Sequence, residues 1–110
     1  MIKRVSLVWK RPELSVEEFQ RRWMGEHVQY AKRLPGVREY VIDFINDGCA
    51  EGPHGIATLR FDSREALDAA FAVVQLKADL MRTRETFAAA VQVMIVDEHV
   101  VVGAASKANE

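Results

Sequence analysis

The strands that this sequence predicts have apolar side chains on both of their faces. Segment 91–96 is almost entirely apolar and β-branched, and segment 37–45 has large apolar residues at both its even and its odd positions. A sheet with one face in water normally alternates apolar and polar residues along each strand. Both faces of the predicted sheet therefore need a covering layer.

Six elements are predicted in the order β-α-β-β-α-β, because strand-like and helix-like periodicities follow one another in that way. The four strands are expected at 2–9, 37–45, 56–61 and 91–96. Residues 98–102 are a candidate extension of the last strand. This order is typical of the α+β ferredoxin-like fold (βαββαβ), in which a four-stranded antiparallel sheet carries its helices on one face.

Both helices begin at residues with the spacing of a capping box, in which two side chains satisfy free amide groups of the first turn. Ser15 and Glu18 open the first helix, expected at 16–33, and Asp62 and Glu65 repeat the spacing before the second helix. The continuation of the second helix towards residue 87 is less regular, and a separate short helix is one interpretation.

Helices that lie on one face of such a sheet leave its other face open. An exposed apolar surface of that size would be a liability for a monomer. The simplest solution is a second copy of the chain, packed sheet against sheet about a two-fold axis. The sequence therefore predicts a homodimer.

The 110 residues suffice for one domain, expected at 1–102, with the small and polar residues 103–110 as a disordered tail. Lys and Arg number 15 against 16 Asp and Glu, which argues against a chain that coats nucleic acid or an anionic membrane. RNA-binding domains of this fold also need stacking aromatic residues on the open sheet face, and the third strand lacks them. With no leader and no long apolar run, the expected location is the cytoplasm, and the single Cys49 forms no internal disulfide.

His27 is the main candidate for proton transfer. It lies four residues after Trp23 on the apolar side of the first helix, so its ring is expected to face the space between helix and sheet. An imidazole titrates near neutral pH and acts there as a base or an acid. The alternative is a buried structural histidine held by one hydrogen bond.

Tyr40 and the remaining histidines are weaker candidates. The Tyr40 phenol would either donate a hydrogen bond to a carbonyl oxygen or pack as a half-buried side chain. His54 ends a glycine-rich loop, a type of segment that often carries functional residues, although loop histidines are commonly solvated. Cys49 and His54 are too few ligands for a metal, so no metal site is expected, and no phosphate-loop pattern is present. His99 is given no role.

Several motifs resemble those of the EthD-domain family. They are Leu14-Ser15-Val16-Glu17-Glu18-Phe19 at a helix start, then Trp23 and His27, then Leu34-Pro35-Gly36 and Tyr40. Gly55-Ile56-Ala57 and Phe61-Asp62-Ser63 extend the likeness into the second half. The resemblance implies a dimeric α/β barrel with a pocket between the helices and the sheet of each subunit.

The resemblance also implies a small cyclic or aromatic substrate, no metal and no organic cofactor. His27 would then move protons next to a carbonyl group, Tyr40 would polarise its oxygen, and His54 would be a second histidine of the site. The residues expected to contact the substrate are Trp9, Trp23 and Phe44. The favoured function is a cofactor-free isomerase, lyase or dehydratase of catabolic or secondary metabolism. The alternatives are a non-catalytic binding or accessory protein, for example in ether degradation, and a monooxygenase-like protein.

The chain also departs from the family pattern. Thr58 and Arg60 stand where members commonly carry an acid and a tryptophan. The third strand lacks the cysteine of the methyllactone isomerases, which argues against that particular activity.

Overall fold

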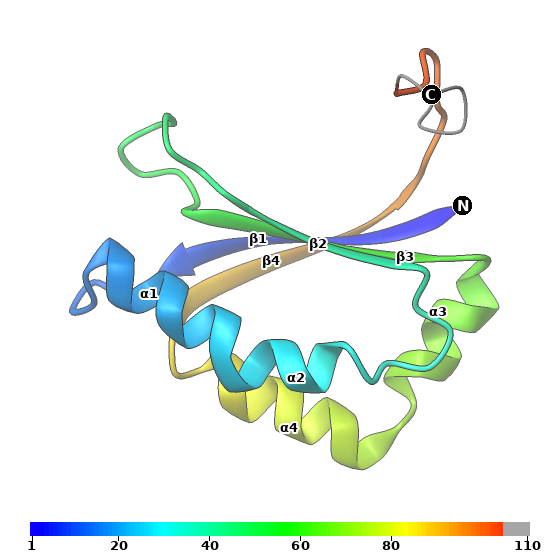
Figure 1. Ribbon diagram of the computed structural model, residues 1–110, viewed down its shortest axis with the longest axis horizontal. Coiled ribbons are helices and arrows are strands. Elements are labelled where there is room, and N and C mark those ends of the chain that lie inside the picture. Colours follow the sequence, from blue (N-terminus) through cyan, green and yellow to red (C-terminus); the bar gives the residue numbers. More distant parts are fainter. Residues whose placement is uncertain (105–110) are drawn as a thin grey trace.

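The computed structural model describes residues 1–104, which form one layer of helices on a four-stranded antiparallel sheet (Figure 1). The strands are β1 (Ile2–Lys10), β2 (Glu39–Phe44), β3 (Gly55–Phe61) and β4 (Ala88–Asp97), in the spatial order β2-β3-β1-β4. The helical segments are α1 (Val16–Arg22), η1 (Trp23–His27), α2 (Val28–Ala31), α3 (Arg64–Phe71) and α4 (Val74–Arg84). The predicted α+β ferredoxin-like arrangement is confirmed. Most of the tail that was expected to be disordered, residues 105–110, lies outside the described residues.

The start of α1 follows only half of the predicted capping box. Ser15 Oγ accepts a 3.1 Å hydrogen bond from the backbone N–H of Glu18, as the spacing predicts. The Glu18 carboxylate does not complete the box, because it binds the guanidinium groups of Arg21 and Arg22 instead.

The cap of α3 was predicted at the wrong residue. Ser63 Oγ accepts a 3.1 Å hydrogen bond from the backbone N–H of Ala66, so Ser63 and not Asp62 is the N-cap. Asp62 instead forms an ion pair with Arg38, at 2.7 Å, and thereby ties the start of α3 to the segment before β2.

The predicted strand extension at 98–102 is wrong. β4 ends at Asp97, which pairs with Ile2, the first residue of β1. The backbone N–H of Glu98 still donates to the carbonyl of Met1 at 3.1 Å. Because β1 begins at Ile2, the residues after Asp97 have no residue of β1 to pair with, and the chain leaves the sheet.

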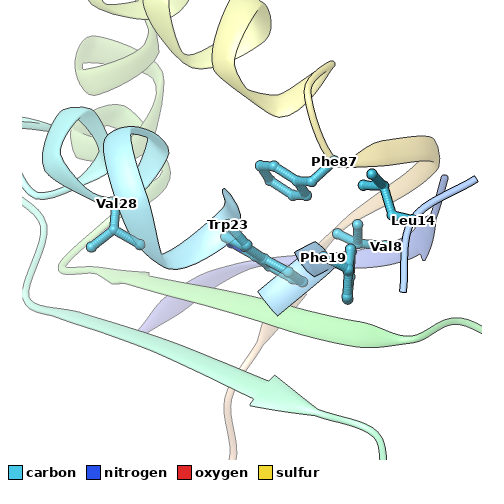
Figure 2. Close-up of a cluster of buried hydrophobic side chains, with 6 residues drawn as sticks. All are labelled: Val8, Leu14, Phe19, Trp23, Val28 and Phe87. Carbon is cyan, nitrogen blue, oxygen red and sulfur yellow. The ribbon is translucent and has the colours of Figure 1, made fainter. Parts of the chain in front are cut away.

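Aromatic side chains form the core between helices and sheet (Figure 2). Trp23 is 1% exposed and stacks on Phe87, with 5.2 Å between ring centroids. Its indole also reaches the sheet at Gly55, where a Cβ atom would overlap the ring. The buried residues of this cluster are Val8, Leu14, Phe19, Trp23, Val28 and Phe87. The contacts with Phe87 and with the sheet at Gly55 therefore hold the Trp23 ring in one orientation.

The second face of the sheet carries no helix, as the sequence predicts (Figure 1). Leu7 pairs with Ile56 of β3 and with Gln92 of β4, and paired residues project from the same face. We call this surface the open face. Its apolar residues are Val5, Leu7, Trp9, Val41, Ile56, Met94 and Val96. No element within residues 1–104 covers them.

Candidate functional site

A cavity of about 270 Å³ lies between the helices and the covered face of the sheet. Most of its wall is apolar. The polar and charged residues that line it are Arg4, Ser6, Trp23, His27, Tyr40, Lys77 and Arg84. Pockets for drug-sized ligands begin at roughly 300 Å³, so this cavity suits a molecule of one or two rings.

A kinked segment of the first helix, η1, carries Trp23 and His27 into the cavity wall. Gly25, in the middle of this segment, has a non-helical ψ of −118° and interrupts the single helix predicted over 16–33. The His27 ring packs edge-on against Phe87, with 5.2 Å between the ring centroids.

The hydrogen bonds of Thr83 fix which nitrogen of neutral His27 carries the proton. Thr83 Oγ1 lies 2.8 Å from His27 Nδ1, 2.8 Å from the carbonyl oxygen of Asp79 and 3.2 Å from that of Leu80. A hydroxyl has one hydrogen and a carbonyl oxygen can only accept, so the hydroxyl donates to a carbonyl and accepts from His27. The proton is therefore on Nδ1, and Nε2 has the free electron pair.

The imidazole of His27 is neutral at pH 7. Burial lowers its pKa to about 4, and the positive charges of Arg84 and Arg4 act in the same direction. The backbone carbonyl of Leu80 opposes this shift without cancelling it. A neutral ring with a free Nε2 is a proton acceptor.

We expect acid to destabilise the fold between pH 6.5 and about 4 because of His27. The unfolded ring gains its proton near pH 6.5 and the folded ring near 4, so the unfolded state binds more protons in this range. The contribution of His27 is complete above pH 6.5 and falls by up to about 3 kcal/mol as the pH decreases through this range. Denaturant unfolding of the wild type and of His27→Gln measures this, and the variant should show the flatter pH profile. Parallel profiles would contradict a buried, neutral His27.

Two hydrogen-bond donors, Trp23 Nε1–H and the Tyr40 hydroxyl, lie together in the cavity wall. Trp23 Nε1 is buried and has no hydrogen-bond partner within residues 1–104. It lies beside the Tyr40 hydroxyl and lowers the pKa of that phenol, but burial has the larger effect and raises it. Tyr40 is therefore protonated at neutral pH and can donate. The carbonyl or enolate oxygen of a ligand is an acceptor that both groups could share.

Trp9 and Phe44, which were expected to contact the substrate, do not line the cavity. Val8 faces the helices, so the next residue, Trp9, projects from the open face. The Trp9 Nε1–H donates to the carbonyl of Glu51 at 3.1 Å. Phe44 faces the helices but packs against the Trp23 ring, with 5.5 Å between centroids. Of the three expected contact residues, only Trp23 lies in the cavity wall.

His54 also lies outside the cavity wall. Its Nδ1 accepts a 2.9 Å hydrogen bond from the backbone N–H of Lys10, and its ring packs edge-on against Phe19. These contacts hold the loop before β3 against the end of β1. Cys49 is exposed in the same loop. The structure therefore brings His27, Trp23 and Tyr40 together and leaves His54 apart from them.

Two further properties concern the whole described chain. Within residues 1–104, no group of three or more His, Cys, Asp or Glu side chains is placed to hold a metal ion. None of the helices in this part of the chain has both the length and the apolar character needed to cross a membrane.

Thr83, Arg4 and Arg84 belong to the site, and the sequence analysis does not identify them. For Arg4 a signal exists, because it alternates with Ser6 and Val8 on the side of β1 that faces the helices. A charge at such an inward position is unusual in a strand of a packed sheet. For Thr83 and Arg84 no local signal exists, since α4 meets η1 only in the folded chain.

Both the sequence and the fold are similar to known proteins. The sequence profile described as the EthD domain matches residues 11–90 of this chain. An EthD family protein of Bacillus halodurans has 21% identity and a TM-score of 0.70, over 90% of this chain and 100% of that one. No curated protein matches the chain.

Two more distant structures share the fold alone. One is a dimeric protein of unknown function from Bacteroides fragilis, with 13% identity and a TM-score of 0.64 over 88% of this chain and 95% of that one. The other is SnoaB, a cofactor-independent oxygenase from Streptomyces nogalater, with 12% identity and a TM-score of 0.62 over 88% and 91%. The profile match, by contrast, spans most of the sequence, and on that ground the chain belongs to the EthD domain family.

Proposed function

We propose that this protein is a cytoplasmic, cofactor-free enzyme of the isomerase, lyase or dehydratase type. Its substrate would be a small cyclic or aromatic carbonyl compound of catabolic or secondary metabolism. The observation that supports this most is the grouping of a neutral His27 with two hydrogen-bond donors, Trp23 and Tyr40, around one small apolar cavity. A base and oxyanion donors are the groups needed to remove a proton next to a carbonyl.

In the proposed reaction the substrate carbonyl oxygen accepts hydrogen bonds from the Tyr40 hydroxyl and from Trp23 Nε1–H. Nε2 of His27 removes a proton from the adjacent carbon, and the electron pair of that C–H bond forms an enolate. The imidazolium then returns the proton to a different carbon, which gives an isomer, or to a departing hydroxide, which gives water and a double bond. Throughout, Thr83 accepts the Nδ1–H and so keeps the ring in place.

Deuterium uptake from D₂O tests the first step without knowledge of the natural substrate. We expect the wild-type protein to exchange α-protons in a panel of cyclic ketones, lactones and polyketide-like phenols, at a rate proportional to protein concentration. Proton NMR measures the loss of signal at the exchanging carbon. The rate should be the same with and without dioxygen.

Two outcomes of this assay would favour the alternatives. Ligands that quench Trp23 fluorescence but show neither exchange nor turnover would indicate a non-catalytic binding or accessory protein. Turnover that requires dioxygen would indicate a monooxygenase-like activity. The structural similarity to a cofactor-independent oxygenase is the reason to test this alternative.

We further propose that the protein is a homodimer in which two open faces pack against each other. The apolar residues of this face support this, because a contiguous apolar patch on a protein surface commonly marks an interaction site. At one end of the face, Lys3 and Arg60 both bind Glu98 at 2.7 Å, so these charges are paired within the chain. The valines at 100–102 are 67% to 92% exposed and lie beyond the sheet on its open side (Figure 1). A structural relative is itself described as dimeric.

A further inference from the structure

Two of the three arginines that form no ion pair within residues 1–104 lie at the cavity. Seven of the ten arginines form an ion pair: Arg11, Arg21, Arg22, Arg38, Arg60, Arg64 and Arg82. The three that form none within residues 1–104 are Arg4, Arg33 and Arg84. Arg33 is exposed and lies over the ring of Tyr30. Arg4 and Arg84 both line the cavity.

Arg4 is held in the cavity wall by neutral groups. Its Nη1 donates a 3.3 Å hydrogen bond to Ser6 Oγ, and its guanidinium lies 4.4 Å from the centre of the Phe71 ring. Burial, and then the positive charge of Arg84, lower the pKa of Arg4. Two like charges at a partly buried site destabilise each other unless an anion binds beside them.

The rest of the wall adds no negative charge. Lys77 of α4 is the third cation, and no Asp or Glu of the described chain lines the cavity. The apolar side chains of Phe71, Leu80 and Phe87 complete this region. Apolar walls exclude water and strengthen the attraction between a cation and an anion. An anionic ligand group is therefore the natural partner of these side chains.

We propose that the ligand is a cyclic carbonyl compound that carries a carboxylate, and that Arg4 and Arg84 bind this carboxylate. The proposal rests on the function proposed above and narrows its substrate class. Two guanidinium groups suit a carboxylate because each offers parallel N–H donors to its two oxygens. A cavity of about 270 Å³ leaves room for a single ring beside that group.

Binding of the carboxylate also has a consequence for His27. The charges of Arg84 and Arg4 oppose protonation of His27, while the Leu80 carbonyl favours it and Thr83 accepts its Nδ1–H. A carboxylate between the two arginines offsets their charge, so His27 becomes a stronger base once the substrate is in place. Neutral analogues should then bind more weakly and also exchange their α-protons more slowly.

The test compares 4-oxocyclohexanecarboxylate with 4-oxocyclohexanecarboxamide, which has nearly the same shape and no charge. Calorimetry at pH 7 should show the acid binding about tenfold to hundredfold more tightly than the amide, the range expected for charged hydrogen bonds. Arg4→Gln and Arg84→Gln should each remove most of this preference, and Arg84→Lys should keep part of it. Arg33→Gln is the matched control, an unpaired arginine away from the cavity, and should keep the full preference.

The deuterium-uptake assay, run on the same two compounds, separates this proposal from the proposed function. If acid and amide bind equally well, or if neither binds, the carboxylate site is overturned. Exchange of the α-protons of the amide would in that case leave the proposed function standing. If the acid binds more tightly but neither compound nor any other ketone exchanges, the anion site holds and the proposed function fails. A preference that survives in both Arg→Gln variants would overturn the assignment to Arg4 and Arg84.

Discussion

Replacement of His27 by alanine is expected to lower turnover at least about 100-fold, the lower range for loss of a general acid–base group. Ligand binding should change far less, because the apolar wall and the donors Trp23 and Tyr40 remain. Steady-state kinetics on any substrate found by deuterium uptake, together with fluorescence titration of binding, measures the two effects separately. A Michaelis constant within a few-fold of the wild-type value would accompany the loss in kcat.

Three further variants test whether the loss of turnover is specific to the His27 ring and to its orientation. His99→Ala removes an exposed histidine and should leave turnover unchanged. Thr83→Val removes the acceptor of the Nδ1–H at nearly constant volume, so it should lower kcat and shift the pH profile, and Thr83→Ser should restore both. If His27→Ala keeps near-wild-type turnover, proton transfer by His27 is wrong.

Replacement of Leu7 by glutamate is expected to convert a dimer into a monomer. Leu7 lies on a central strand of the open face, so the new carboxylate would be buried without a partner between the two sheets. The free energy needed to bury an unpaired carboxylate is larger than the free energy that the apolar contacts of this interface supply. Light scattering coupled to size exclusion measures the mass, which should fall from two chains to one.

The matched control for this prediction is Val74→Glu. Val74 is 81% exposed at the start of α4, on the helix side of the molecule, and the same change there should leave the dimer intact. Circular dichroism of both variants would show that each remains folded. A wild-type protein with the mass of one chain would contradict the dimer.

Those parts of the fold that depend on local patterns could be predicted from the sequence. Alternation along β2 places Tyr40 and Phe44 on the helix side, and the i, i+4 spacing of Trp23 and His27 places them on one side of a helix. The same alternation also argues against Trp9 as a ligand contact, since it follows the inward Val8. The prediction of Trp9 as a ligand contact rests on its aromatic side chain and not on its position in the strand.

The rest of the site depends on contacts between distant segments. Thr83 orients His27 across a separation of 56 residues, and Arg84 and Arg4 line one cavity only because α4 packs against η1. Gly25 interrupts the first helix with a kink that helix propensity alone does not specify. Charge at the cavity is therefore a property of the packed structure and not of any single motif.

The state of the His27 ring tests the central claim most directly. Long-range ¹H–¹⁵N NMR of the imidazole nitrogens distinguishes a protonated from a free nitrogen and follows each ring through a pH titration. At pH 7 we expect the proton of His27 on Nδ1 with Nε2 free, and a neutral ring down to about pH 4. A proton on Nε2, or a ring that titrates near the ordinary value of 6.5, would contradict the account.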